Sequence, residues 1–73
     1  MIRIRLAYLL LDREIKLKEL AERTGIAVNN LSILKTNKAR AIRFSTLNRL
    51  CAALQCTVGE LIEYVPSDSE QNE

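Results

Sequence analysis

The sequence predicts an all-α domain: a compact five-helix bundle over residues 1–65, followed by an acidic tail over 66–73. The 73 residues include only two glycines and one proline, too few for the many turns of a small β-sandwich. Apolar side chains make up 48% of the chain and aromatic ones only 4%, so the core must be aliphatic. Apolar residues recur at helical spacing in successive segments. A chain of this size buries only about 60% of the surface exposed by its unfolded form, which excludes a large pocket between two domains.

The first predicted helix covers residues 3–13, where Leu6, Leu9 and Leu10 form an apolar stripe. The first five residues also alternate between apolar and basic side chains. That period-two pattern fits a short strand as well.

The second and third predicted helices cover residues 17–24 and 28–35. Gly25 follows the second helix and supplies the left-handed conformation that commonly ends a helix. On the third helix, a helical projection groups Asn30 with Leu31 and Leu34 on the inner side.

The fourth predicted helix covers residues 45–54, with Ser45 as its N-cap. The fifth opens with a capping box at residues 57–60, continues to Val65 and stops at Pro66. Helices this short need a shared core. The expected core residues are Leu6, Leu9, Leu10, Leu20, Ala21, Leu31, Leu34, Phe44, Leu47, Leu50, Cys51, Leu54, Leu61 and Ile62.

Charge is distributed unevenly along the chain. Residues 1–66 carry all 11 Lys and Arg and only six Asp and Glu, a net charge of +5, whereas the last seven residues carry three acids and no base. Between Glu22 and Glu60 there is no carboxylate, but there are six cations. A field of one sign favours a polyanionic partner such as nucleic acid; the alternative is a solvated basic surface. The acidic tail is expected to be disordered.

Several function classes are disfavoured. The chain has no His, the commonest acid/base group at neutral pH and a frequent metal ligand. Its acid pairs have no accompanying nucleophile and base, so we expect no enzyme, no cofactor, no metal and no small-molecule ligand. Cys51 and Cys56 are five residues apart, a spacing that fits no metal or disulfide framework and suits a reducing, cytoplasmic setting. The apolar run near the start is too short to span a bilayer.

Only residues 25–27 separate the second and third helices. A three-residue turn containing Gly forces the second helix across the first at a steep angle, and the small Ala21 allows the close approach. With Leu31 and Leu34 as anchors, the other side of the third helix projects outward. A helix presented in this way fits the major groove of B-DNA.

Residues 16–38, KLKELAERTGIAVNNLSILKTNK, resemble the helix-turn-helix of the Cro/phage-repressor (XRE-like) family of bacterial transcriptional regulators. The downstream IRFSTLNRLCAALQCTVGELIEY is similar to the fourth and fifth helices of that family. The resemblance covers residues 3–65 and implies a lambda-repressor-like domain. It further implies a sequence-specific regulator of double-stranded DNA, a repressor, acting as a homodimer on two half-sites.

The resemblance also implies roles for individual residues. The positions that read base edges are occupied by Val28, Asn29, Ser32 and Ile33. An Asn29 amide can bond adenine in bidentate fashion, whereas Val28 and Ile33 can touch a thymine methyl or contact a protein instead. The positions that grip phosphates are occupied by Lys16, Lys18, Lys35, Thr36, Lys38, Arg40 and Arg43. Arg43 is alternatively placed to approach the minor groove.

The sequence departs from the family pattern at both helix starts. Lys16 stands where the second helix often has a capping residue, and Ala27 where Ser or Thr often precedes the recognition helix. The apolar reading surface keeps a second function open, a protein-binding module of the same fold such as an antitoxin or anti-repressor. Candidate dimer patches are residues 1–4, as a strand or arm, and residues 61–65 with Tyr64.

Overall fold

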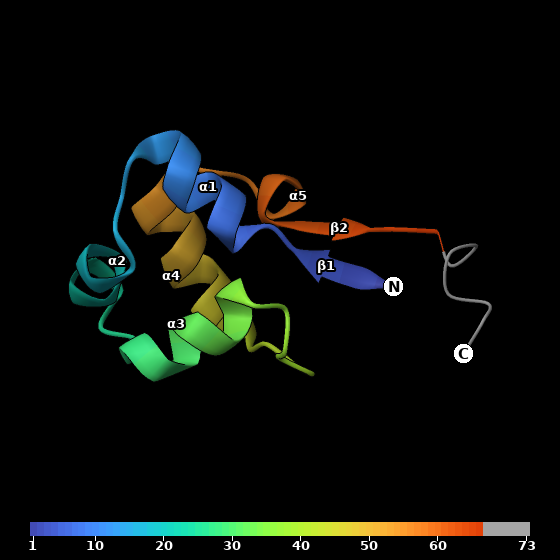
Figure 1. Cartoon of the computed structure of the whole chain (residues 1–73), viewed down its shortest axis with the longest axis horizontal. Helices are drawn as coiled ribbons and strands as arrows, with labels where there is room; N and C mark the ends of the chain where they lie inside the picture. Colours follow the sequence, from blue (N-terminus) through green and yellow to red (C-terminus); the bar gives the residue numbers. More distant parts are fainter. Residues whose placement is uncertain (67–73) are drawn as a thin grey trace.

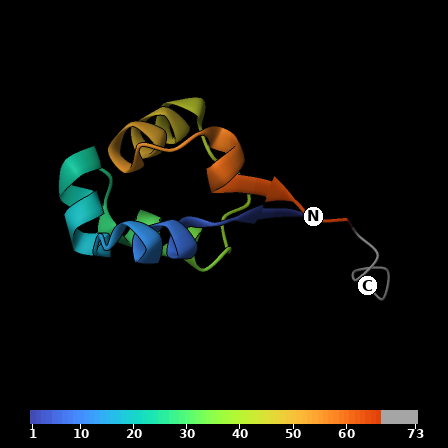
Figure 2. The ribbon, with the colours of Figure 1, turned by 90° about the horizontal axis from the view of Figure 1, so that it is seen from above.

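The computed structural model describes residues 1–66, and residues 67–73 lie outside the described part. In chain order the elements are β1 (Ile2–Ile4), α1 (Leu6–Arg13), α2 (Leu17–Thr24), α3 (Val28–Lys35), α4 (Phe44–Leu54), α5 (Val58–Leu61) and β2 (Ile62–Tyr64). The five helices form one body, and the two strands project together from one end of it (Figure 1). A second view shows the same projecting pair beside the N-terminus (Figure 2). The expected acidic tail falls almost entirely outside the described residues.

The core is built from leucine. Seven leucines are less than 2% exposed, and they come from all five helices: Leu6, Leu9, Leu20, Leu31, Leu50, Leu54 and Leu61. The bounds expected for α2 and α3 are confirmed to the residue. These bounds were predictable because leucines recur at helical spacing in each helix and Gly25 marks the boundary between the two.

A purely all-α fold is wrong, because the two ends of the domain pair as an antiparallel sheet. Ile2 lies opposite Tyr64 and Ile4 opposite Ile62. Helix α1 therefore begins at Leu6 rather than residue 3, and the strand alternative for the first residues is confirmed. Helix α5 ends at Leu61, not Val65. The β-branched and aromatic residues that follow favour a strand once an alternating partner is available.

The start of α4 also differs from expectation. The helix begins at Phe44, its N-cap is Arg43 without a side-chain cap bond, and Ser45 lies inside it. Phe44, expected in the core, is 86% exposed. Burial declines toward this end of α4: Leu50 is fully buried, Leu47 is half-buried and Phe44 is open. The first turn of the helix extends past the core, so its apolar face has nothing to pack on.

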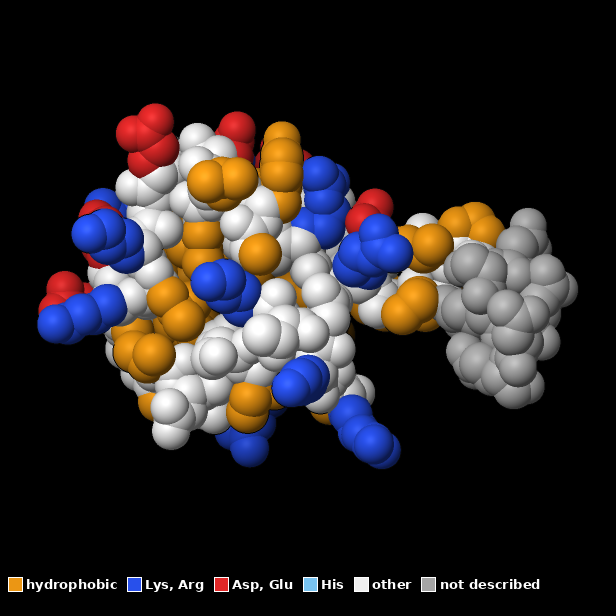
Figure 3. All heavy atoms as spheres, viewed as in Figure 1, with side chains coloured by type: hydrophobic (Ala, Val, Ile, Leu, Met, Phe, Trp, Pro, Cys, Tyr) orange, Lys and Arg blue, Asp and Glu red, His pale blue; other side chains and the backbone are white. Residues whose placement is uncertain are grey.

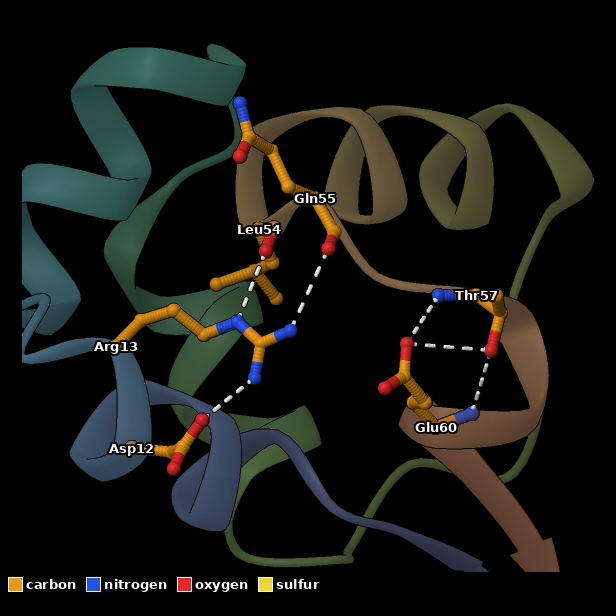
Figure 4. A network of polar contacts seen from close by, with 6 residues as sticks. All are labelled: Asp12, Arg13, Leu54, Gln55, Thr57 and Glu60. Atoms are coloured by element: carbon orange, nitrogen blue, oxygen red, sulfur yellow. Dashed lines mark hydrogen bonds and ion pairs between the residues drawn. The ribbon is translucent and has the colours of Figure 1, made fainter.

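Polar contacts brace the opposite end of α4 (Figure 4). The Arg13 guanidinium donates to the carbonyl oxygen of Leu54 at 3.0 Å and to that of Gln55 at 3.4 Å, and it pairs with Asp12 at 2.7 Å. These carbonyls end a helix and lack intrahelical partners. Arg13 thereby joins the end of α1 to the end of α4.

The capping box expected at the start of α5 is confirmed. The Thr57 hydroxyl accepts from the Glu60 N–H at 3.1 Å, and the Glu60 carboxylate accepts from the Thr57 N–H at 2.8 Å. The bond from that backbone N–H is the main reason why the pKa of Glu60 is lowered.

Candidate DNA interface

The turn between α2 and α3 is fixed by Gly25 and Thr24. Gly25 has φ 74° and donates its N–H to the Ala21 carbonyl at 2.9 Å, the C-cap expected from sequence. The Thr24 hydroxyl donates to the Leu20 carbonyl at 2.8 Å and accepts from the Ile26 N–H at 3.2 Å. Sequence reasoning missed this role of Thr24, although a Thr before the turn glycine is able to bond the local backbone.

Helix α3 packs on the core with one face and exposes the opposite face. Leu31 is fully buried and Leu34 is 5% exposed. On the outer side Asn29 is exposed, Val28 and Ile33 are 43% and 45% exposed, and Ser32 is half-buried. Because two leucines fix the rotation of the helix, its outward face is defined even though its side chains touch little else.

Neither α2 nor α3 has a side-chain cap. The N-caps are Lys16 and Ala27, and neither side chain bonds the first turn. This confirms the departure from the family pattern. The first-turn N–H groups of both helices thus point outward without a side-chain acceptor.

The expected phosphate-gripping cations are exposed and unengaged. Within residues 1–66, none of their side chains has an ion pair or hydrogen bond to another protein group: Lys16, Lys18, Lys35, Lys38, Arg40 and Arg43. In contrast, Arg23 pairs with Glu19 at 2.6 Å. In Figure 3 the lower edge of the molecule carries Lys and Arg but no Asp or Glu, and the acids lie along the upper and left margins and beside the strands. The free cations need break no internal contact before they bind an anion.

Thr36 stands apart from the other residues expected at phosphates. Its hydroxyl lies 3.0 Å from the Ser32 carbonyl and 3.3 Å from the Ile33 carbonyl, and it donates within the helix. In this conformation its oxygen is left only to accept.

Asn37, which follows α3, joins that end of the helix to β1. Its side-chain carbonyl accepts from the Ile4 N–H at 2.6 Å, and its amide donates to the Ile4 carbonyl at 3.0 Å. Its own φ is 62°, a conformation that Asn tolerates better than most residues. Sequence reasoning missed Asn37, and the available signal was an Asn just past the end of a helix.

An open groove of about 420 Å³ runs between α3, the following loop and the start of α4. Asn30 and Ile33 line it from α3, and Arg43 lines it from the loop. Asn30, grouped with the inner residues by the helical projection, is in fact exposed. It therefore joins the polar groups available beside the outer face of α3.

The described residues give no support to a metal site, since they contain no group of three or more His, Cys, Asp or Glu side chains placed to hold an ion. Burial, followed by the neighbouring Cys51, raises the pKa of the Cys56 thiol to about 11. At neutral pH that thiol is protonated and a weak nucleophile. Within residues 1–66, no helix is long and apolar enough to cross a bilayer.

Helices α2 and α3 meet at a tight turn, and α3 presents an open outer face with unpaired cations around it. This arrangement is typical of helix-turn-helix DNA-binding domains. Comparison with known proteins agrees: residues 5–67 match the Cro/C1-type HTH DNA-binding domain, and the chain belongs to this family. It is also similar to YozG, an uncharacterised HTH-type transcriptional regulator of Bacillus subtilis (strain 168). The two are 49% identical over 61 residues, which cover 84% of this chain and 73% of that protein. No solved structure matches the chain significantly.

Proposed function

We propose that the protein is a transcriptional repressor that binds a specific double-stranded DNA site with α3 in the major groove. The observation that carries this proposal is the open outer face of α3, set by the buried Leu31 and Leu34 and rimmed by unpaired cations. The similarity to a transcriptional regulator supports it.

Sequence is read by the outer face of α3, through Val28, Asn29, Ser32 and Ile33. Asn29 carries the specificity, because one exposed amide can donate to N7 and accept from N6 of the same adenine. Val28 and Ile33 add apolar contact with thymine methyl groups.

Affinity comes from phosphates, through Lys16, Lys18, Lys35, Thr36, Lys38, Arg40 and Arg43. The uncapped first turns of α2 and α3 support this role, since their free N–H groups favour a nearby anion. Arg43 lies farthest along the loop and is also positioned to enter the minor groove.

Repression follows from occupancy: two copies bound to adjacent half-sites, about one helical turn apart, block a promoter that overlaps the site. A reporter gene placed behind the selected site tests this, because the repressor must lower its expression and a mutated site must restore it. Raised expression would instead mark an activator.

The binding experiment is selection of bound sequences from a random duplex pool, followed by affinity measurements over a range of salt concentrations. We expect one enriched motif and a log–log salt slope of about −0.9 per phosphate contacted. A pool that enriches no motif contradicts sequence-specific binding.

A second function is favoured by one observation, the 43% and 45% exposure of Val28 and Ile33 on the reading face. An apolar pair of this kind also suits docking to a protein, as in an antitoxin or anti-repressor. The salt titration separates the two functions, since an apolar protein interface responds little to salt. A flat response with a protein partner bound would replace the DNA proposal.

A further inference from the structure

A hollow of about 670 Å³ lies where α1, the start of α2 and the end of α3 meet. In Figure 3, seen from the same side as Figure 1, hydrophobic side chains and a Lys or Arg side chain are visible between the positions of α1 and α3. None of the residues that line the hollow belongs to the base-reading face of α3. The lining is mainly apolar, and its apolar residues are Ala7, Leu10, Leu11, Ile15 and Leu17.

The apolar lining is contiguous and largely open to solvent. Ala7 and Leu11 are four residues apart on α1 and share one side of the helix. Leu11 is 79% exposed, Ile15 and Leu17 are half-buried, and Leu10 is buried beneath them. Exposed apolar side chains that gather in one place, rather than singly, mark an interaction surface.

Two lysines border the hollow, Lys16 from the N-cap of α2 and Lys35 from the last turn of α3. Neither side chain has an ion pair or hydrogen bond within residues 1–66. Glu14 also lines the hollow, so two positive charges and one negative charge give a net charge of +1. A matching ligand is therefore apolar on one side and acidic along its edge.

The openness and the charge select the occupant. A drug-sized ligand is normally buried over about 70–90% of its surface, which this hollow, edged by exposed side chains, does not provide. Residues 67–73, SDSEQNE, have no apolar side chain to cover Leu11. A second copy that faced this hollow with its own across a two-fold axis would set the lysines of both copies against one another. A segment of a different protein meets none of these objections.

We propose that the hollow is the docking site for an acidic amphipathic helix of a different protein. Its aliphatic side chains pack on Leu11 and Leu17, and its carboxylates pair with Lys16 and Lys35. A helix laid with its apolar face in a hydrophobic groove is a recurring mode of recognition, with anchors at i, i+3, i+4 and i+7.

This docking site rests on the proposed function and adds a regulator to it. Lys16 and Lys35 are two of the cations expected at DNA phosphates, so a helix that pairs with them competes with DNA. Because coupling between two ligands is reciprocal, the docked helix weakens DNA binding and DNA expels the helix. Loss of both phosphate contacts lowers the salt slope by about 1.8, at about 0.9 per contact.

The test uses two display libraries of helical peptides that share one leucine stripe. The flanking positions hold Asp and Glu in one library, and Lys and Arg in the other. Each library is selected on the whole chain, and we expect enrichment from the acidic library alone. A peptide synthesised from that pool should bind Leu11→Gln about 10- to 100-fold more weakly than the wild type, as expected for one buried leucine.

The matched control is Tyr8→Gln. Tyr8 is 52% exposed on the same helix but does not line the hollow, so this variant should bind the peptide as the wild type does. Leu11 is 79% exposed, so Leu11→Gln should fold normally, which urea unfolding verifies. Both variants should bind the selected duplex with wild-type affinity.

The selected peptide is then titrated into each protein bound to the selected duplex. We expect it to release the duplex from the wild type and Tyr8→Gln, and not from Leu11→Gln at the same concentration. A duplex that stays bound beside the peptide would overturn the competition.

The remaining outcomes separate this proposal from the proposed function. If the peptide binds through Leu11 but no duplex is ever bound, the docking site stands and the proposed function fails. If no acidic peptide is enriched, or if the peptide binds Leu11→Gln as tightly as the wild type, the docking site is wrong and DNA binding is unaffected. Decanoate bound in the hollow where no peptide binds would assign the site to a small carboxylate instead.

Discussion

The two ends of the helical body use polar side chains in opposite ways. Where α1, α4 and α5 meet, Arg13 bonds two carbonyls at a helix end, and Thr57 and Glu60 cap a helix reciprocally. On the α2–α3 side, both helices begin without side-chain caps, and the side chains of the cations expected at phosphates have no internal partner, in contrast to Arg23, which pairs with Glu19. Polar side chains at the first end stabilise helix termini, whereas on the α2–α3 side the cations expected at phosphates remain available for a ligand. Substitutions at the two ends should therefore separate stability from DNA affinity.

The largest expected effect lies beneath the open face. Leu31→Ala removes a fully buried side chain and should lower the free energy of unfolding by about 2–5 kcal/mol. Ile33→Ala, two residues along and 45% exposed, is the matched control, and surface changes usually stay within about 0.5 kcal/mol. Urea unfolding measures both. Similar losses in the two variants would show that the outer face is packed, contrary to the separation of roles on α3.

The sequence predicts most features of α2 and α3 because these features depend on residues close together in the chain. The bounds of α2 and α3, the Gly25 turn, the buried leucines and the missing caps all depend on residues at most a few positions apart, so periodicity and capping rules find them. The sheet could not be found in the same way. The C-terminal segment 62–65 fits a helix as well as a strand, and only pairing with residues 2–4, about sixty positions away, decides between them.

The same limit explains what was missed at the site. Asn37 acts on Ile4, 33 positions earlier, and no local pattern predicts that contact. Phe44 fits the apolar repeat of α4, but the core ends before it. Where the core ends depends on the overall shape of the domain, which the spacing of apolar residues does not reveal. The roles of individual residues at DNA remain predictions.

The next effect should appear at the braced end. Arg13→Met keeps the aliphatic stem but removes charge-assisted bonds to Leu54 and Gln55, so we expect a loss of about 1.5–3 kcal/mol in unfolding free energy. Arg23→Met, which removes an exposed pair with Glu19, should cost only about 0.3–0.5 kcal/mol. Neither variant should change the affinity of the folded protein for a selected duplex. A drop in affinity in Arg13→Met under fully folded conditions would contradict the division between the two ends.

On the outer face of α3, a substitution should change the affinity for DNA and leave stability unchanged. Asn29→Ala should weaken binding to the selected site by about 1–3 kcal/mol and binding to random DNA very little. The melting temperature should stay unchanged, because the Asn29 side chain is exposed and bonds no other group of the described residues. Asn48→Ala, an exposed helical Asn on α4, serves as the control. Equal weakening on both kinds of DNA would remove Asn29 as a specificity residue.

Arg43→Ala tests the other kind of contact, and its effect should be smaller and uniform. Loss of one phosphate contact weakens selected and random duplexes alike and lowers the salt slope by about 0.9. Binding measured at several salt concentrations gives the slope directly. If the loss instead depends on the AT content of the flanking sequence, Arg43 reads the minor groove.

The smallest effect returns to the braced end and depends on pH. Hydrogen bonds from Thr57 hold the pKa of Glu60 below its usual value, so its carboxylate stabilises the fold above the unfolded-state pKa, and that contribution is lost as pH falls through the folded pKa. Acid should therefore reduce the unfolding free energy of the wild type more than that of Glu60→Gln, in urea titrations at neutral and acidic pH. Thr57→Ala should remove only a smaller part of this pH dependence, because the hydroxyl is lost but the backbone N–H of residue 57, the main cause of the lowered pKa, still bonds the Glu60 carboxylate. A pH dependence in Glu60→Gln equal to that of the wild type would mean that it arises outside the capping box.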